Sequence, residues 1–114
     1  MALSREERES LTRQLFEAVA AVGFLTWKQQ YPQDAAAALA GFSPEQLRDD
    51  YFREFERTAG AEIREMAGRA SDDRLRDSLH DWTGRAQRMA TADRQRTEGR
   101  ETTRSKRRDW EHDR

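Results

Sequence analysis

The stretch Asp34-Ala-Ala-Ala-Ala-Leu-Ala-Gly-Phe-Ser-Pro-Glu-Gln-Leu47 decides the architecture of this chain. Its alanine-rich part predicts a short helix over residues 35–40, capped by Asp34 and closed by Gly41. The segment Ser43–Gln46 supplies an N-cap serine, a proline suited to the first helical position and a glutamine that completes a capping box. Two helices joined by a tight glycine turn make a helix-turn-helix in the geometric sense, which DNA-binding proteins and ordinary helical bundles share.

Apolar residues recur at three- and four-residue steps in three longer segments, which is the spacing of one face of an α-helix. These segments predict helices over residues 5–30, 44–67 and 72–92. Ser4 and Glu7 have the spacing of a capping box at the start of the first. No segment alternates like a β-strand, so the predicted fold class is all-α, a small helical bundle of three long helices and one short helix. The residues expected to be largely buried are Leu15, Val19, Val22, Leu47, Phe55, Leu79 and Trp82.

Composition separates this bundle from a charged C-terminal tail. Charged residues make up 38% of the 114 residues, hydrophobic residues make up 35%, and the mean hydropathy is -1.15. Met89 is the last large aliphatic or methionine residue, and so polar a segment beyond it cannot offset the entropy of ordering. We therefore expect a helical bundle domain over residues 1–92 and an arginine-rich tail over residues 93–114, disordered or extending the last helix.

Charge is distributed unevenly along the chain, although the formal net charge is only -1. Residues 34–73 carry a net charge of -5 and residues 74–114 carry +4. Such segregation predicts an interaction tail, or a tail that folds back onto its own domain. The cations expected to contact phosphate or an acidic protein surface are Arg96, Arg100, Arg104, Lys106, Arg107 and Arg108.

Signals of enzymatic chemistry are sparse. The chain has no cysteine, which excludes disulfides and thiolate metal sites, and it has no phosphate-binding glycine loop. Asp77 and His80 share one helical face, but a single pair of this kind is more simply a surface interaction than a metal or catalytic site. We therefore expect no enzymatic activity, no cofactor and no metal.

The sequence also favours a particular cellular setting. No apolar run approaches the roughly 20 residues that cross a bilayer, and the charged N-terminus lacks the apolar core of a signal peptide. We expect a cytoplasmic protein with no membrane contact. Only two of the 21 basic residues are lysine, and together with abundant alanine this codon preference indicates a GC-rich bacterial or phage genome.

The segment Ala37–Ser43, with Leu47 and the pair Tyr51-Phe52, resembles the DNA-binding segment of TetR-type repressors. The resemblance covers residues 15–52 at most and implies a short recognition helix that starts at Pro44. The chain departs from the family pattern in a longer segment before Ala37 and in an aromatic pair displaced by one residue. The exposed face of that helix would also carry mainly acidic residues, which repel a phosphate backbone. A helix-turn-helix transcriptional regulator is therefore the alternative function, and nucleic acid the second choice of partner.

Aromatic residues favour a protein partner, because aromatic and arginine side chains anchor interfaces. We predict a small non-enzymatic regulator, adaptor or inhibitor that acts through an aromatic-acidic helical face, with help from the basic tail. The same face is a candidate for homodimerisation, since a domain with so few apolar residues gains stability by dimerising. The residues predicted to bind protein are Trp27, Tyr31, Asp49, Asp50, Tyr51, Phe52 and Glu54.

Overall fold

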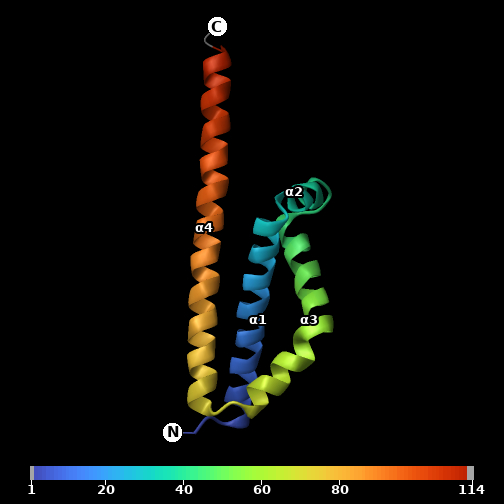
Figure 1. Ribbon diagram of the computed structural model, residues 1–114, viewed down its shortest axis with the longest axis vertical. Coiled ribbons are helices and arrows are strands. Elements are labelled where there is room, and N and C mark those ends of the chain that lie inside the picture. Colours follow the sequence, from blue (N-terminus) through green and yellow to red (C-terminus); the bar gives the residue numbers. More distant parts are fainter. Residues whose placement is uncertain (1, 113–114) are drawn as a thin grey trace.

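The computed structural model describes the backbone of residues 2–112 and the side chains of residues 2–96. Over this range the chain forms helices α1 (Arg5–Gln30), α2 (Pro32–Gly41), α3 (Pro44–Arg69) and α4 (Asp72–His112) (Figure 1). The described backbone contains no strand, so the predicted all-α fold is confirmed.

The helices form an open bundle with α1 in the middle. Helix α1 packs along α4 on one side and along α3 on the other, and α2 lies across the end of α1 and the start of α3 (Figure 1). Within the described residues, the backbones of α3 and α4 hardly approach each other. Helix α4 runs well beyond the other helices, which gives the molecule extents of 68 × 27 × 21 Å. The three long helices therefore form one layer instead of closing around a central core.

Local hydrogen bonds start the long helices where the sequence predicts. At α1, the backbone N–H of Glu7 donates to Ser4 Oγ at 3.1 Å, and the Glu7 side chain accepts from the Ser4 N–H at 3.4 Å. Ser43 and Gln46 repeat this capping box at α3, with both distances 3.2 Å. At α4, Ser71 Oγ accepts from the N–H of Arg74 at 3.2 Å. Each box satisfies N–H groups that the first helical turn leaves without a partner.

Helix α2 differs from its prediction at both ends. It begins at Pro32, earlier than predicted, because a proline at the first helical position already has the helical φ angle. Asp34 consequently lies in the first turn, and Tyr31 is the N-cap residue without a side-chain cap. No described residue has a positive φ, so Gly41 does not provide the expected left-handed turn. The chain turns instead through Phe42, which has an extended backbone with φ -132° and ψ 149°.

Helix α3 bends near its middle, so that its centre stands away from α1 and its second half runs back toward the start of α1 (Figure 1). We attribute the bend to Gly60, a residue type that often accompanies helix kinks. The side chain of Glu56 lies over this glycine, so an added Cβ would stand 2.8 Å from the Glu56 carboxyl carbon. Glu56 also pairs with Arg64, so the ion pair spans the glycine.

The core lies near the α3–α4 turn, where α1 meets both neighbours. Leu15 from α1, Ala67 from α3 and Leu75 from α4 form the buried cluster, and Leu75 is the one large side chain described with less than 2% exposure. Of the residues predicted in the core, Leu15 and Val22 are buried. The open layer leaves one side of α3 and of α4 uncovered. The remaining predicted core residues are therefore only partly buried: Val19, Leu47, Phe55, Leu79 and Trp82.

Two ion pairs hold α1 against α4 in parallel order. Near the α3–α4 turn, Arg8 pairs with Asp72 and also donates to the carbonyl oxygens of Ala67 at 3.0 Å and Ala70 at 2.7 Å. These carbonyls belong to the last turn and the end of α3, so one guanidinium joins three helices. The backbone N–H of Leu3 donates to Asp72 at 2.9 Å, and this bond, together with Arg8, lowers the pKa of the Asp72 carboxyl.

At the other end of α1, Lys28 pairs with Asp93 of α4 at 2.9 Å. Both side chains are only 24% exposed, so water screens this pair less than a fully exposed one. The seam between α1 and α4 therefore carries one ion pair at each end, with the apolar side chains of the core in between.

Candidate protein-binding surface

Helix α2 carries an exposed apolar surface. Two exposed aromatic residues bracket this helix, Tyr31 at its N-cap and Phe42 at its C-cap, each 52% exposed. Ala35 is its only buried residue, and no charged side chain occurs between Ala35 and Phe42. The exposed apolar residues, which we call the α2 face, are Tyr31, Ala36, Ala37, Leu39, Ala40 and Phe42.

The α2 face borders the part of α4 that leaves the bundle. A hollow of about 330 Å³ separates the two, with Pro32 and Leu39 of α2 on one wall and Asp93 and Arg96 of α4 on the other. Lys28 lies in the same hollow, where it pairs with Asp93. An apolar side chain entering this hollow would contact Leu39 on one side and charged groups on the other.

Acidic residues flank this region on α3. Asp49, Asp50 and Glu54 are all exposed, as predicted for residues of a binding surface. Glu54 pairs with Arg57, and this hydrogen bond lowers the pKa of the Glu54 carboxyl. The first half of α3 therefore carries an exposed acidic surface.

The structure turns most of the predicted aromatic contacts inward. Tyr51 lies between α1 and α3, with its ring centroid 5.4 Å from that of Phe24 and 6.2 Å from that of Phe55. Burial raises the pKa of its hydroxyl. The hydroxyl oxygen lies 2.7 Å from the place that a Cβ on Gly23 would occupy, so a larger residue there would displace the ring. Tyr51 thus packs between these two helices and is only partly exposed.

Trp27 and Phe52 are also only partly exposed. Trp27 stacks on Phe24 with 6.1 Å between ring centroids. The guanidinium of Arg48 covers the ring of Phe52 at 4.7 Å. Of the aromatic residues predicted to bind protein, Tyr31 is the one that is mainly exposed. Sequence reasoning missed Leu39 and Phe42, although the absence of a polar stripe on α2 was a signal for an exposed apolar helix.

The helix-turn-helix geometry is present, but its charges oppose DNA. Helix α2 crosses the start of α3 at a steep angle, so α2 is seen nearly end-on in Figure 1. Glu45, Asp49 and Asp50 are exposed at the start of α3, and the only cation of residues 43–50 is Arg48, which stacks on Phe52. A phosphate backbone approaching this face would meet a net negative charge.

Only one cation of the predicted basic tail belongs to the described side chains. Arg96 is exposed and lies 3.9 Å from Asp93. The backbone of α4 continues to His112. The side chains of the other predicted tail residues lie outside the described residues: Arg100, Arg104, Lys106, Arg107 and Arg108.

Among the described residues, no group of three or more histidine, cysteine or acidic residues is arranged to hold a metal ion, and His80 lies exposed on α4. No described helix is both long and apolar enough to span a bilayer. No protein-family model, curated protein or solved structure matches the chain.

Proposed function

We propose that this chain is a small non-enzymatic binding protein, a regulator, adaptor or inhibitor, that occupies the surface of another protein with its α2 face. The proposal includes a bacterial or phage origin and a cytoplasmic setting. The observation that carries it is the exposure of Tyr31, Leu39 and Phe42 on and around a helix that lacks a polar stripe. Soluble proteins seldom leave such a contiguous apolar surface in water unless it binds something.

The chemistry of the α2 face suits an interface core. Aromatic side chains are enriched among the residues that dominate binding energies, and Tyr31 and Phe42 stand about 15 Å apart, one at each end of a ten-residue helix. The alanines between them are small, so a partner surface can approach the helix backbone closely. The partner expected for this face is therefore a shallow apolar groove that accepts two aromatic side chains.

Charge restricts the partner further. Asp49, Asp50 and Glu54 place negative charge on α3, the helix that follows α2, so the partner should carry basic residues near its apolar groove. Rim charges of this kind mainly accelerate association and exclude acidic competitors. The basic residues of the tail would contact acidic parts of the same partner.

Site-specific photo-crosslinking tests this proposal directly. A photoreactive amino acid replaces Phe42 in tagged full-length protein within the native host, and Glu17, exposed on α1, is the matched control position. We expect one crosslinked protein from position 42 and none from position 17. Phe42→Ser should then weaken the purified complex at least tenfold, while Glu17→Ser leaves its dissociation constant unchanged.

Two results would overturn the proposal. One is a partner that crosslinks equally from positions 17 and 42, or that binds Phe42→Ser with undiminished affinity. The other is tight, salt-dependent binding of duplex DNA by the full-length protein at physiological salt, which would promote the helix-turn-helix regulator.

A further inference from the structure

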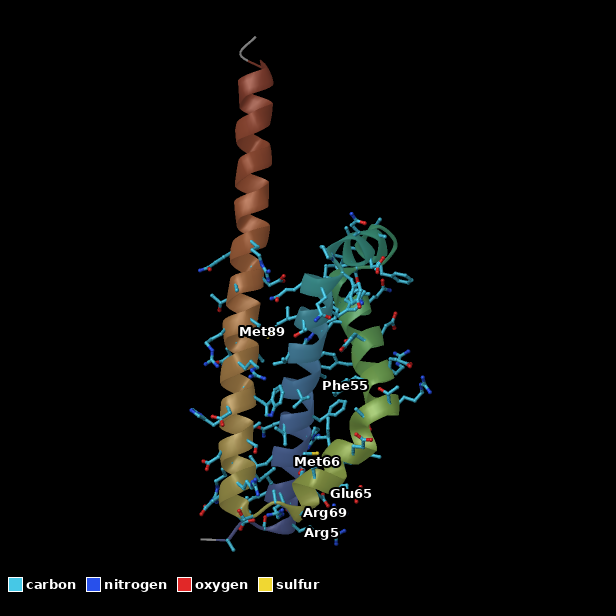
Figure 2. The ribbon with its side chains drawn as sticks, in the orientation of Figure 1. Arg5, Phe55, Glu65, Met66, Arg69 and Met89 are labelled. Carbon is cyan, nitrogen blue, oxygen red and sulfur yellow. The ribbon has the colours of Figure 1, made fainter. Side chains whose placement is uncertain are left out.

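The open face between α3 and α4 forms a second apolar surface, at the end of the molecule opposite to α2. Its groove of about 580 Å³ runs over α1, and we call it the α3–α4 groove. Met66 of α3 projects there and is 71% exposed, more than any other large apolar side chain described (Figure 2). The apolar lining consists of Leu15, Val19, Ile63, Met66, Leu75 and Trp82.

A single layer of helices is an incomplete arrangement. Stable domains are built from at least two packed layers, because a helix must bury its apolar side against another element. Here α3 and α4 both pack on α1 and leave their facing sides uncovered. Ile63, Met66 and Trp82 therefore line a groove where a further layer would complete the core.

Charged residues on the two rims of the groove are arranged in a matching order. On α3, Glu62 and Arg69 are seven residues apart, which places them on the same side of the helix. On α4, Arg74 and Asp81 have the same spacing. Because α3 runs toward the α3–α4 turn and α4 away from it, both arginines lie near the turn and both acidic residues about two helical turns away.

These rim charges are available for a partner. Within the described part of the chain, Glu62, Arg74 and Asp81 form no ion pair. Arg69 pairs with Glu65 at 2.5 Å, but both side chains are more than half exposed, so the pair is exchanged at little cost. Each rim therefore offers one positive end and one negative end.

We propose that a second copy of this chain covers the α3–α4 groove in a two-fold symmetric dimer. With the two-fold axis running across the helices, Arg69 faces the partner's Glu62 and Arg74 faces the partner's Asp81. An axis parallel to the helices would place Arg69 against the partner's Arg74 and Glu62 against the partner's Asp81, which are repulsive pairs. The order of charges thus selects the antiparallel arrangement, a self-complementary interface of the kind that homodimers use.

The same symmetry fixes which side chains meet at the centre. Met66 lies near the midpoint between Glu62 and Arg69, and Ser78 lies near the midpoint between Arg74 and Asp81. Met66 therefore packs on its own counterpart, and Ser78 faces its own counterpart. The interface is at the small end of specific contacts, so we expect dissociation constants on the order of micromolar. Both α2 faces stay free at opposite ends of the dimer, independently of the function proposed above.

Sedimentation velocity of the full-length protein over a concentration range of about 1–500 μM tests the dimer. We expect Met66→Asp to be monomeric throughout, and because Met66 is 71% exposed its folding should be intact by circular dichroism. Phe42→Asp, which changes the equally accessible α2 face, should dimerise like the unmodified protein. Monomeric unmodified protein at the highest concentration, or a dimer that survives Met66→Asp, would overturn the proposal.

Charge reversal and cysteine crosslinking test the orientation. Glu62→Arg should weaken dimerisation at least fivefold, and the double variant Glu62→Arg with Arg69→Glu should restore it. The chain has no cysteine, so Ser78→Cys introduces a single thiol that should link to its counterpart through a short bismaleimide, whereas Thr91→Cys on the same helix should not. Equal crosslinking from both positions, or no restoration by the double variant, would contradict the antiparallel arrangement. A dimer abolished by Phe42→Asp would place self-association on the α2 face instead.

Discussion

Substitution of Leu75 by alanine gives a quantitative test of where the core lies. Leu75 is 1% exposed and packs with Leu15 and Ala67, so its truncation removes buried apolar atoms and leaves a cavity that three helices enclose. Such substitutions cost about 2–5 kcal/mol, and the nearly complete burial here points to about 3 kcal/mol or more. For a folded part of roughly 90 residues the unfolding entropy is about 0.19 kcal/mol/K, which converts this loss to a fall in Tm of about 15 °C.

The measurement is urea unfolding followed by circular dichroism at a protein concentration of about 2 μM, below the concentrations at which dimers form. Met66→Ala is the matched control, because Met66 is also apolar but 71% exposed, and it should cost less than about 1 kcal/mol. Leu79→Ala, at a partly buried position of the same helix, should fall between them at about 2 kcal/mol. A loss below about 1 kcal/mol for Leu75→Ala, or losses that do not follow this order, would refute the assignment of the core.

Three further perturbations have defined outcomes. The pKa of Asp72 is lower in the folded state than in the unfolded chain, so its stabilisation is complete above pH 4 or so and is lost as pH falls through the folded pKa. Asp72→Asn should therefore flatten the pH dependence of the free energy of unfolding below about pH 5, and an unchanged slope would show that the carboxylate is not held as described. Gly23→Ala should destabilise the fold, because the new Cβ meets the Tyr51 hydroxyl. In a Tyr51→Phe background the same substitution should stabilise the fold by up to about 1 kcal/mol, because alanine has a higher helix propensity than glycine. Equal effects in both backgrounds would contradict the steric explanation. Deletion of residues 97–114 should lower the rate of association with the partner of the α2 face more than it raises the rate of dissociation. Stopped-flow measurements at several salt concentrations give both rates. A larger change in the dissociation rate would show that the tail forms a close contact with the partner.

Helix positions could be predicted from sequence because their signals are local. Ser4 and Ser43 each find a capping partner three residues ahead, so helix starts depend on a few neighbouring side chains. The start of α2 was wrong because two local signals competed, an N-cap aspartate and a first-position proline, and the rigid proline prevailed.

The candidate surface was harder to predict, because its exposure depends on distant residues. Tyr51 packs against α1 with its hydroxyl beside Gly23, where a larger residue on that other helix would displace it. The bend in the middle of α3, near Gly60, is likewise a feature that no apolar period reveals. With Tyr51 inward and the layer open, the exposed apolar side chains become Leu39 and Phe42 at one end and Met66 at the other.

The central place of α1 also sets the order in which the molecule can form during synthesis. The ion pairs that join α1 to α4 link residues 64 and 65 positions apart, so the first helix made finds its main partner last. Helices form within microseconds, whereas a ribosome adds about 5–20 residues per second. The interval between completion of α1 and arrival of Asp93 is therefore about 3–13 s. During this interval the apolar side of α1 that α4 later covers is exposed to solvent. Chaperones or a second nascent chain can therefore bind it before the fold is complete.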